Sequence, residues 1–353
     1  MTLAESVLKG DRLTLARLLT QVENLTAEGR AALAALFPHS GRAHLIGVTG
    51  APGTGKSTLV NRLALNFRAQ NKRVAIVAVD PSSPFTGGAV LGDRVRMRDL
   101  SGDPGVFIRS MASRGSLGGL ARSTAGVVQV FDAAGYEIVL IETVGAGQGE
   151  VDIARLAHTT LVVEAPGLGD DIQAIKAGIL EIADILVVNK ADRPGVENTE
   201  KALKSMLELA HPTQRIYSHH GALIPAPLPG TEGNAVMEKE NLWIPPIQRT
   251  VSTEGQGISE LADQIVKHAE FLRSSGTWTA RDQARLASEL ELTLQQTLMD
   301  QFRARESETR YNEVLQQVFK RSLSPWEAVA ILTKAYDRLN VSDREDPHSG
   351  GEK

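Results

Sequence analysis

The sequence predicts an α/β fold, with a mainly parallel sheet covered by helices on both faces and helical extensions at both ends. From about residue 44, apolar runs rich in β-branched residues alternate with helical patterns. These runs are continuously apolar, as expected for parallel strands that are buried on both faces. The expected strands are residues 44–49, 73–79, 106–109, 136–142, 159–164, 184–189 and 247–251.

Other segments are assigned from local patterns. Residues 1–40 are expected to form an N-terminal extension of two short helices, and residues 41–275 the main domain. Within that domain, residues 211–246 are rich in proline and glycine, which indicates an inserted surface loop. Residues 276–345 are expected to be helical, with a capping box and an N1 proline at 324–327, and residues 346–353 a disordered tail.

Composition limits the classes of function. The chain has 353 residues, 42% hydrophobic and 23% charged, with a net charge of −4. It gives no reason to expect nucleic-acid or membrane binding, and we expect a cytoplasmic protein. With 0 cysteines, the chain has no disulfides, thiolate nucleophiles or thiolate metal sites. The adjacent pair His219 and His220 is interpreted as part of a solvated loop.

The segment after the first expected strand is typical of a phosphate-binding loop. Glycines let successive backbone N–H groups and the start of the next helix point at a phosphate. The lysine charge would lie on the β- and γ-phosphates, and the following serine hydroxyl on Mg²⁺. The expected nucleotide-binding residues here are Gly50, Ala51, Pro52, Gly53, Thr54, Gly55, Lys56, Ser57 and Thr58.

A second motif, at the end of strand 184–189, identifies the base. Asn189, Lys190 and Asp192 form an N-K-x-D sequence. The Asp192 carboxylate can accept from guanine N1–H and the 2-amino group, whereas adenine offers neither donor on that edge. We expect Lys190 to cover the base and Asn189 to join this loop to the phosphate-binding loop. The nucleotide is therefore predicted to be GTP.

Acidic residues after two other strands suggest a metal shell. Glu142 stands where regulatory GTPases place the aspartate of D-x-x-G, and Asp80 ends the strand at 73–79. With Asp93, these carboxylates could surround Mg²⁺, while Arg96 could neutralise phosphate charge. The alternatives are a solvent-facing acid at Glu142 and an exposed ion-pair loop around Asp93.

Longer segments resemble one family. The chain looks like the methylmalonyl-CoA mutase-associated GTPases of the MeaB/ArgK type, which are chaperones of adenosylcobalamin-dependent acyl-CoA mutases. The resemblance is continuous over residues 45–192 and looser to residue 275. The segments that carry it are 78–89, 91–97, 109–120 and 142–148.

The resemblance implies a dimeric P-loop GTPase with helical extensions, and it assigns residues to sites. The Mg²⁺ shell would be Ser57, Asp80, Asp93, Glu142 and Thr143. Lys56 and Arg96 would contact phosphates. The last guanine-side loop would be Ser252, Thr253 and Glu254, and the switch that couples nucleotide to mutase would include Gln173 and Lys176. From residue chemistry alone, the segment around Lys176 is a helix start with a solvated lysine.

The chain departs from the family pattern in two places. Ala146 and Gly149 replace larger residues in the second switch, and the insertion at 211–246 is longer than expected. The smaller switch residues leave open how tightly that loop is ordered. The longer insertion could alter partner choice.

The expected function is a GTP-hydrolysing chaperone that uses GTP/GDP and Mg²⁺ and gates cofactor loading, protection or reactivation of an acyl-CoA mutase. An adenosyltransferase is a further candidate partner, and residues 276–345 are the expected dimerisation segment. The catalytic candidates are Lys56, Asp93, Glu142 and Gln148, the last to position water. Alternatives are a kinase or ATPase that phosphorylates an amino-acid transport protein, which the N-K-x-D motif disfavours, and a nickel-insertion GTPase, which the absence of cysteine disfavours.

Overall fold

The computed structural model describes residues 2–81, 97–100, 102–113, 119–143, 149–167, 182–210, 215–219, 222–226 and 243–342. The chain divides into two compact units. The first unit is Met1–Leu286 and the second is Ala287–Lys353. The described part of the chain contains no helix long and apolar enough to span a membrane.

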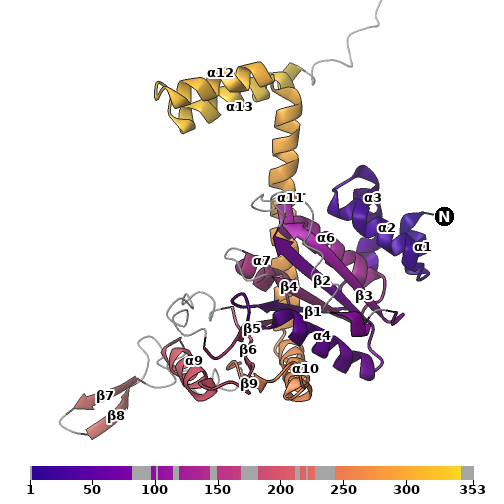
Figure 1. The fold of residues 1–353 in the computed structure, drawn as a ribbon. Helices are drawn as coiled ribbons and strands as arrows, with labels where there is room; N and C mark the ends of the chain where they lie inside the picture. The colour runs from indigo at the N-terminus through magenta and orange to yellow at the C-terminus, as the bar shows by residue number, and fades with distance from the viewer. Residues whose placement is uncertain are drawn as a thin grey trace, which may run out of the picture. The chain divides into compact units, whose positions relative to one another are not determined.

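A 7-stranded parallel sheet forms the centre of the first unit (Figure 1). Its strand order is β3-β2-β4-β1-β5-β6-β9, which places β1 between β4 and β5. This agrees with the predicted fold class and with the predicted strands. The strands are β1 (His44–Thr49), β2 (Val74–Pro81), β3 (Val106–Ser113), β4 (Ile138–Thr143), β5 (Thr159–Glu164), β6 (Ile185–Asn189) and β9 (Ile247–Thr250).

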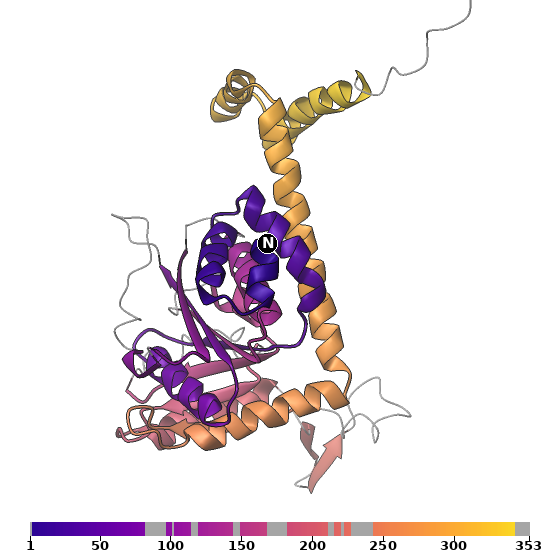
Figure 2. The same ribbon diagram turned by 90° about the vertical axis from the view of Figure 1, so that its right-hand side faces the viewer.

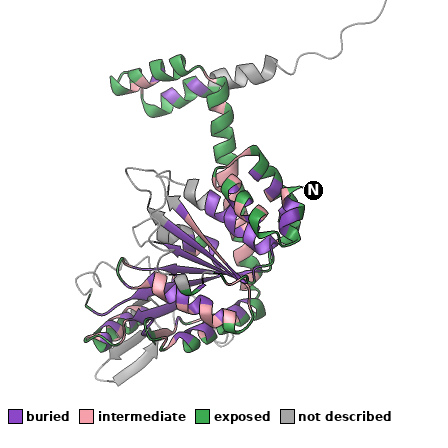
Figure 3. Cartoon of the chain, turned by 45° about the vertical axis from the view of Figure 1, so that its right-hand side comes forward, coloured by how far each residue is buried: buried purple, intermediate pink, exposed green. Residues whose placement is uncertain are grey.

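Both faces of the sheet are covered, which explains why its strands are apolar without alternation. Ile46 and Val48 of β1 pack toward α4 (Lys56–Ala69) and α10 (Ile258–Ser274), which lie together on one face (Figure 2). Leu45 packs on the other face, with α6 (Gly119–Ala133) and α7 (Gly149–Leu156). Figure 3 shows the central strands β1, β4, β5 and β6 as buried, whereas the edge strands β3 and β9 are only partly buried. The sheet therefore has an apolar core on each side.

The N-terminal extension contains three α-helices rather than the two predicted: α1 (Leu3–Leu8), α2 (Arg12–Glu23) and α3 (Ala27–Leu36). The prediction missed the break at Gly10, where φ is +87°, and the cap at Asp11, whose carboxylate accepts from Leu13 N and Thr14 N. These helices lie beside α6 (Figure 1), and Gln129 of α6 donates to Leu33 O at 2.8 Å. A short 3₁₀ helix, η1 (Phe37–His39), follows.

The sequence predicted a surface loop for the inserted segment, but part of this segment forms strands. It follows α9 (Val196–Ala210) and contains β7 (Arg215–His219) and β8 (Ala222–Ala226). These two strands pair antiparallel in a separate 2-stranded sheet. Proline at 225 is compatible with this pairing because such a hairpin consists of edge strands, where Pro is tolerated.

The second unit contains most of α11 (Thr277–Arg305), together with α12 (Glu308–Phe319) and α13 (Pro325–Ser342). The predicted capping box begins α13: Ser324 N donates to Glu327 Oε2 at 2.9 Å and Glu327 N to Ser324 Oγ at 3.3 Å. The sequence analysis expected this segment to be helical but did not predict the break between α11 and α12, at Glu306 and Ser307. Apart from a small buried cluster of Val314, Ala328 and Leu332, many apolar residues of this unit are exposed. Most of the described part of this unit is coloured as exposed in Figure 3.

Candidate functional site

The loop between β1 and α4 requires glycine because its backbone passes very close to neighbouring strands. Gly50 has φ +137°, and a Cβ there would lie 2.1 Å from Val163 O of β5. Gly55 has φ +94° and caps α4, and a Cβ there would lie 2.5 Å from Asn189 Nδ2 of β6. Both φ values lie where side chains are strained. The loop therefore lies at the ends of three adjacent strands, where ligands bind in parallel α/β sheets.

Lys56 is the first residue of α4 and is 6% exposed. Its Nζ donates to Gly50 O at 2.8 Å and to Ala51 O at 2.9 Å. These bonds hold the ammonium group over the loop, at the start of a helix whose backbone N–H groups also attract anions. The arrangement places positive charge where the sequence predicts phosphate.

Ser57 and Glu142 meet across the end of the sheet. Ser57 Oγ donates to Glu142 Oε1 at 2.6 Å. Glu142 lies on β4 opposite Val48 of β1, and its residue is 5% exposed. The alternative of a solvent-facing acid therefore does not apply. The next residue, Thr143, donates through Oγ1 to Thr49 Oγ1 at 3.2 Å.

These oxygen atoms fit a hard divalent cation. A serine hydroxyl and a carboxylate are ligands that Mg²⁺ prefers, and Ser57 lies at the start of α4 as the motif requires. Asp80 is the next-to-last residue of β2, which pairs with β4 so that Val79 lies opposite Thr143. Within the described residues no three His, Asp or Glu side chains form a metal-binding group.

Asn189 connects the candidate base-recognition loop to the phosphate-binding loop. Its Nδ2 donates to Thr54 O at 2.8 Å. Its Oδ1 accepts from Thr250 Oγ1 at 3.1 Å, Ser252 N at 3.2 Å and Ser252 Oγ at 2.7 Å. The residue is 2% exposed, so both ends of this buried amide form hydrogen bonds. One side chain thus fixes three loops relative to one another.

The residues that follow Asn189 are more exposed than Asn189 itself. Lys190 has φ +57°, a left-handed conformation that is uncommon outside glycine, and its Nζ donates to Gly53 O. Asp192 is exposed. Strained backbone at such a position is typical of ligand-binding loops. The carboxylate of Asp192 is therefore accessible to a base, beside the phosphate-binding loop.

The segment 252–254 follows β9 and lies beside the same amide. Ser252 is buried, whereas Thr253 and Glu254 are exposed. The sequence analysis missed Arg62 of α4, which contacts this segment: Nε donates to Ser252 O at 3.0 Å and Nη2 to Thr253 O at 2.7 Å. No sequence motif marks Arg62, since its partners are carbonyl groups that any residue could supply.

Several predicted site residues are not brought together here, because they lie outside the described residues. For Asp80, the structure describes the backbone but not the side chain. The predicted residues outside the described ranges are Asp93, Arg96, Gln148, Gln173 and Lys176.

A buried histidine cluster, which the sequence analysis also missed, lies at the other end of the sheet. It comprises His44 at the start of β1, His158 before β5 and His268 on α10. Thr159 Oγ1 lies 2.7 Å from His44 Nε2 and 2.9 Å from His268 Nδ1. Burial lowers the pKa of His44 well below its usual value.

Charged residues at the start of α11 contact this cluster. Arg281 donates to both carboxylate oxygens of Asp184, at 2.8 and 2.9 Å. His158 Nδ1 accepts from Leu45 N at 3.1 Å, so its Nε2 carries the hydrogen that faces Asp282 Oδ1 at 3.1 Å. Burial lowers the pKa of His158, although Asp282 opposes that shift.

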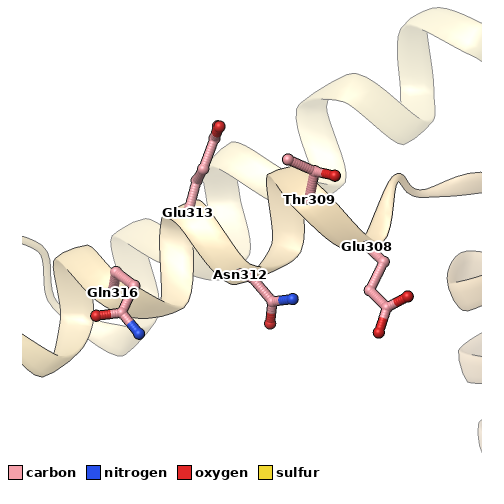
Figure 4. Close-up of a pocket in the computed structure, with 5 residues that line it drawn as sticks. All are labelled: Glu308, Thr309, Asn312, Glu313 and Gln316. Carbon is pink, nitrogen blue, oxygen red and sulfur yellow. The ribbon is translucent and has the colours of Figure 1, made fainter.

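Hollows lie along the described helices of the second unit. One hollow has a volume of about 420 Å³ and is lined by five polar side chains, all from α12, which are labelled in Figure 4. Another, of about 360 Å³, is an apolar groove between α11, α12 and α13. Its lining includes Met299, Phe302, Tyr311, Val329 and Leu332. The groove suits apolar protein side chains better than a charged nucleotide.

Comparison with known proteins identifies similar chains. The family model described as "Methylmalonyl Co-A mutase-associated GTPase MeaB" matches residues 15–307. A Pyrococcus abyssi protein, provisionally named a GTPase, is 41% identical over 332 residues, which are 94% of this chain and 95% of that protein. GTPase ArgK of Escherichia coli is 33% identical over 332 residues, 92% of this chain and 93% of that protein.

A mammalian relative and a solved structure extend the comparison. The mouse protein named methylmalonic aciduria type A homolog, mitochondrial, is 30% identical over 292 residues, 82% of this chain and 65% of that protein. The crystal structure of a LAO/AO transport system kinase has a TM-score of 0.66 and 26% identity. It covers 95% of this chain and 96% of that one.

Proposed function

Because the chain belongs to the family of methylmalonyl Co-A mutase-associated GTPases, we propose that it is a GTP-hydrolysing chaperone of an adenosylcobalamin-dependent acyl-CoA mutase. The proposed role is to gate loading, protection or reactivation of the mutase cofactor. The observation that carries the nucleotide part is the position of Asn189, whose side chain joins the phosphate-binding loop to the base-recognition loop. That connection supports a single site for phosphate and base.

Hydrolysis in this site rests on positioning and charge. Lys56 would leave the carbonyls of the loop to contact the β- and γ-phosphates, while Ser57 and Glu142 would hold Mg²⁺. The bound ion would neutralise phosphate charge that develops as the γ-phosphoryl group leaves. Asp80, Asp93, Thr143 and Arg96 are proposed to complete the shell and the phosphate contacts, and Gln148 to position water.

Base recognition would lie between the loops that Asn189 connects. Asp192 would accept from guanine N1–H and the 2-amino group, and Lys190 would cover the base. Segment 252–254 would close the far side of the base. These roles all depend on buried Asn189 bonds that keep the loops in fixed relation.

The mutase part of the proposal rests on the family. Its name specifies association with methylmalonyl Co-A mutase, and the mouse relative is named for methylmalonic aciduria. Gln173 and Lys176 are the proposed coupling switch between nucleotide and mutase. An adenosyltransferase is a further proposed member of the complex, because adenosylcobalamin must be supplied to the mutase.

A homodimer is the proposed assembly, formed through the helical segment 276–345. The observation that favours it is the exposed apolar surface of the second unit, where Leu290 is 70% and Leu294 54% exposed. Such stripes need another surface to cover them. Val329→Glu in the apolar groove should shift sedimentation toward monomer, with exposed Thr309→Glu as the matched control. An unchanged sedimentation coefficient for Val329→Glu would remove this groove from the proposed interface.

The main experiment is co-purification with candidate acyl-CoA mutases, followed by GTPase assays with and without each one. We expect one mutase to bind and to change the rate of hydrolysis. If none binds or changes turnover, the chaperone proposal fails while the GTPase assignment stands.

The alternative of a kinase that uses ATP is favoured only by the name of the similar crystal structure. A competition assay between ATP and GTP distinguishes it. Preference for ATP, with transfer of phosphate to a transport protein, would support the kinase instead.

A further inference from the structure

We propose that Arg62 is a positioning residue for base selectivity: it orients the peptide unit between Ser252 and Thr253 so that the Thr253 N–H faces the 6-oxo group of guanine. This inference rests on the proposed function, because it assumes that guanine lies beside segment 252–254. It assigns a role to a residue of α4 that no nucleotide motif includes.

The first argument is the geometry of the arginine. Arg62 Nε donates to Ser252 O at 3.0 Å, and Nη2 donates to Thr253 O at 2.7 Å. A guanidinium group is planar and presents its N–H groups in a rigid fork. Two successive carbonyls that both accept from this fork have fixed directions. Arg62 lies on the helix that begins at Lys56, so the segment is tied to the phosphate-binding element.

The second argument follows from the peptide bond. The structure contains no cis peptide bond in its described part, so the Thr253 N–H points opposite to the Ser252 C=O. When Arg62 fixes that oxygen, it also fixes the direction of the N–H. A charged donor on the oxygen polarises the peptide and strengthens the N–H as a donor.

The third argument is that Thr253 N–H is the amide left for a ligand. Ser252 N donates to Asn189 Oδ1 at 3.2 Å, and Glu254 N donates to Val251 O at 3.0 Å. Within the described residues, Thr253 N makes no hydrogen bond. Thr253 is exposed, whereas its neighbour Ser252 is buried and anchored to Asn189.

The chemistry of guanine completes the argument. Its recognition edge carries two donors, N1–H and the 2-amino group, and one acceptor, the 6-oxo group. Asp192 can satisfy the two donors, so the acceptor needs an N–H from another loop. Adenine has a 6-amino donor in that place, and two donors that face each other disfavour binding. The Thr253 amide would therefore add selectivity that a carboxylate alone does not provide.

The test measures equilibrium affinities of the full chain for three nucleotides: GDP, 6-thio-GDP and IDP. In 6-thio-GDP a weaker acceptor replaces the 6-oxo oxygen, whereas IDP lacks only the 2-amino group. The variants are Arg62→Ala and Arg62→Lys. The lysine variant keeps the positive charge but lacks the planar guanidinium group that donates to both carbonyls. The control is Arg30→Ala, since Arg30 also donates to a carbonyl, Leu25 O at 2.7 Å, but lies on α3. Thermal midpoints report folding of each variant.

We expect Arg62→Ala to weaken GDP binding by about tenfold, as loss of one hydrogen bond predicts. The preference for GDP over 6-thio-GDP should shrink, while the preference for GDP over IDP should stay. Arg62→Lys should be intermediate, and it serves the same comparison if the alanine variant does not fold. Arg30→Ala should bind all three nucleotides as the wild type does.

Equal weakening of all three nucleotides would overturn the inference, because it would indicate only a general loosening of the segment. Unchanged affinities in both Arg62 variants would overturn it as well. In either case guanine binding by the wild type leaves the proposed function standing. If the wild type does not bind GDP, the proposed function and this inference both fail.

Discussion

The Ser57 hydroxyl, at the start of α4, donates a hydrogen bond of 2.6 Å to Glu142 Oε1 of β4, a residue far away in the sequence. This contact joins the phosphate-binding loop to the strand that carries the proposed metal-binding acid. Both groups are oxygen ligands, and Mg²⁺ would replace their mutual hydrogen bond with bonds to itself.

Glu142→Gln should raise the Mg²⁺ concentration needed for half-maximal GTP hydrolysis by about 10–100-fold, because a neutral amide is a weaker ligand than a carboxylate. A Mg²⁺ titration of the hydrolysis rate measures this change. Nucleotide binding in EDTA should be unaffected. If the Mg²⁺ concentration for half-maximal hydrolysis is the same in the variant and the wild type, Glu142 does not hold the ion.

Lys56→Ala should lower the rate of GTP hydrolysis by about 10²–10³-fold, because it removes the charge proposed to contact the transferring phosphate. Single-turnover hydrolysis measures this rate. Lys72→Ala is the matched control, since Lys72 forms an exposed ion pair with Glu137 at the other end of the sheet. Retained activity in Lys56→Ala would contradict the phosphate-loop assignment.

Asn189→Ala should destabilise the protein by about 1–3 kcal/mol, because it leaves Thr54 O and Ser252 N without their buried partner. It should also weaken GDP binding, since the two loops lose their connection. Chemical denaturation and GDP titration measure both effects. Asn66→Ala removes a more exposed amide on α4 and should change neither. Wild-type stability in the Asn189→Ala variant would contradict the proposal that the Asn189 side chain holds these loops together.

The histidine cluster predicts a loss of stability in mild acid. Burial lowers the pKa values of His44 and His158 in the folded state, so the unfolded chain takes up protons first as the pH falls. Stability should be constant above the unfolded histidine pKa of about 6.5 and should fall below it, by at most about 1.4 kcal/mol per pH unit for each histidine.

Denaturation midpoints between pH 5 and 8 measure this effect. Asp184 and Asp282 have lowered pKa values, with burial opposing the hydrogen bonds that lower them. Their contribution is lost only at a pH below about 3.8, so it does not overlap the histidine range. His44→Gln should flatten the slope, and an equal slope in that variant would assign the acid sensitivity to other groups.

The strands could be predicted from sequence because burial on both faces leaves a direct record of continuous apolar residues, as in Val74 to Val79 of β2. The break between α1 and α2 was harder to see, since it depends on one left-handed glycine, Gly10, and a polar cap. Helix α12 has an apolar stripe of Tyr311, Val314, Leu315, Val318 and Phe319, but the break before it, at Glu306 and Ser307, contains no glycine or proline that would mark it in the sequence.

The candidate site could be predicted where a motif fixes local geometry. The phosphate loop and Asn189 belong to this class, because loop conformation and residue type follow from the ligand. Arg62 and the histidine cluster could not be predicted. Arg62 recognises backbone carbonyls that leave no trace in side-chain identity, and His44, His158 and His268 are brought together only by the sheet order.

Strand β6 links the two ends of the sheet mechanically. It is five residues long, with Asp184 directly before it and Asn189 at its end. A backbone of about 17 Å in a strand is already extended and cannot stretch. Any displacement of Asn189 along the strand axis would therefore move Asp184 by a similar distance. Arg281, which is bonded to both Asp184 oxygens, would carry that displacement into the first turns of α11.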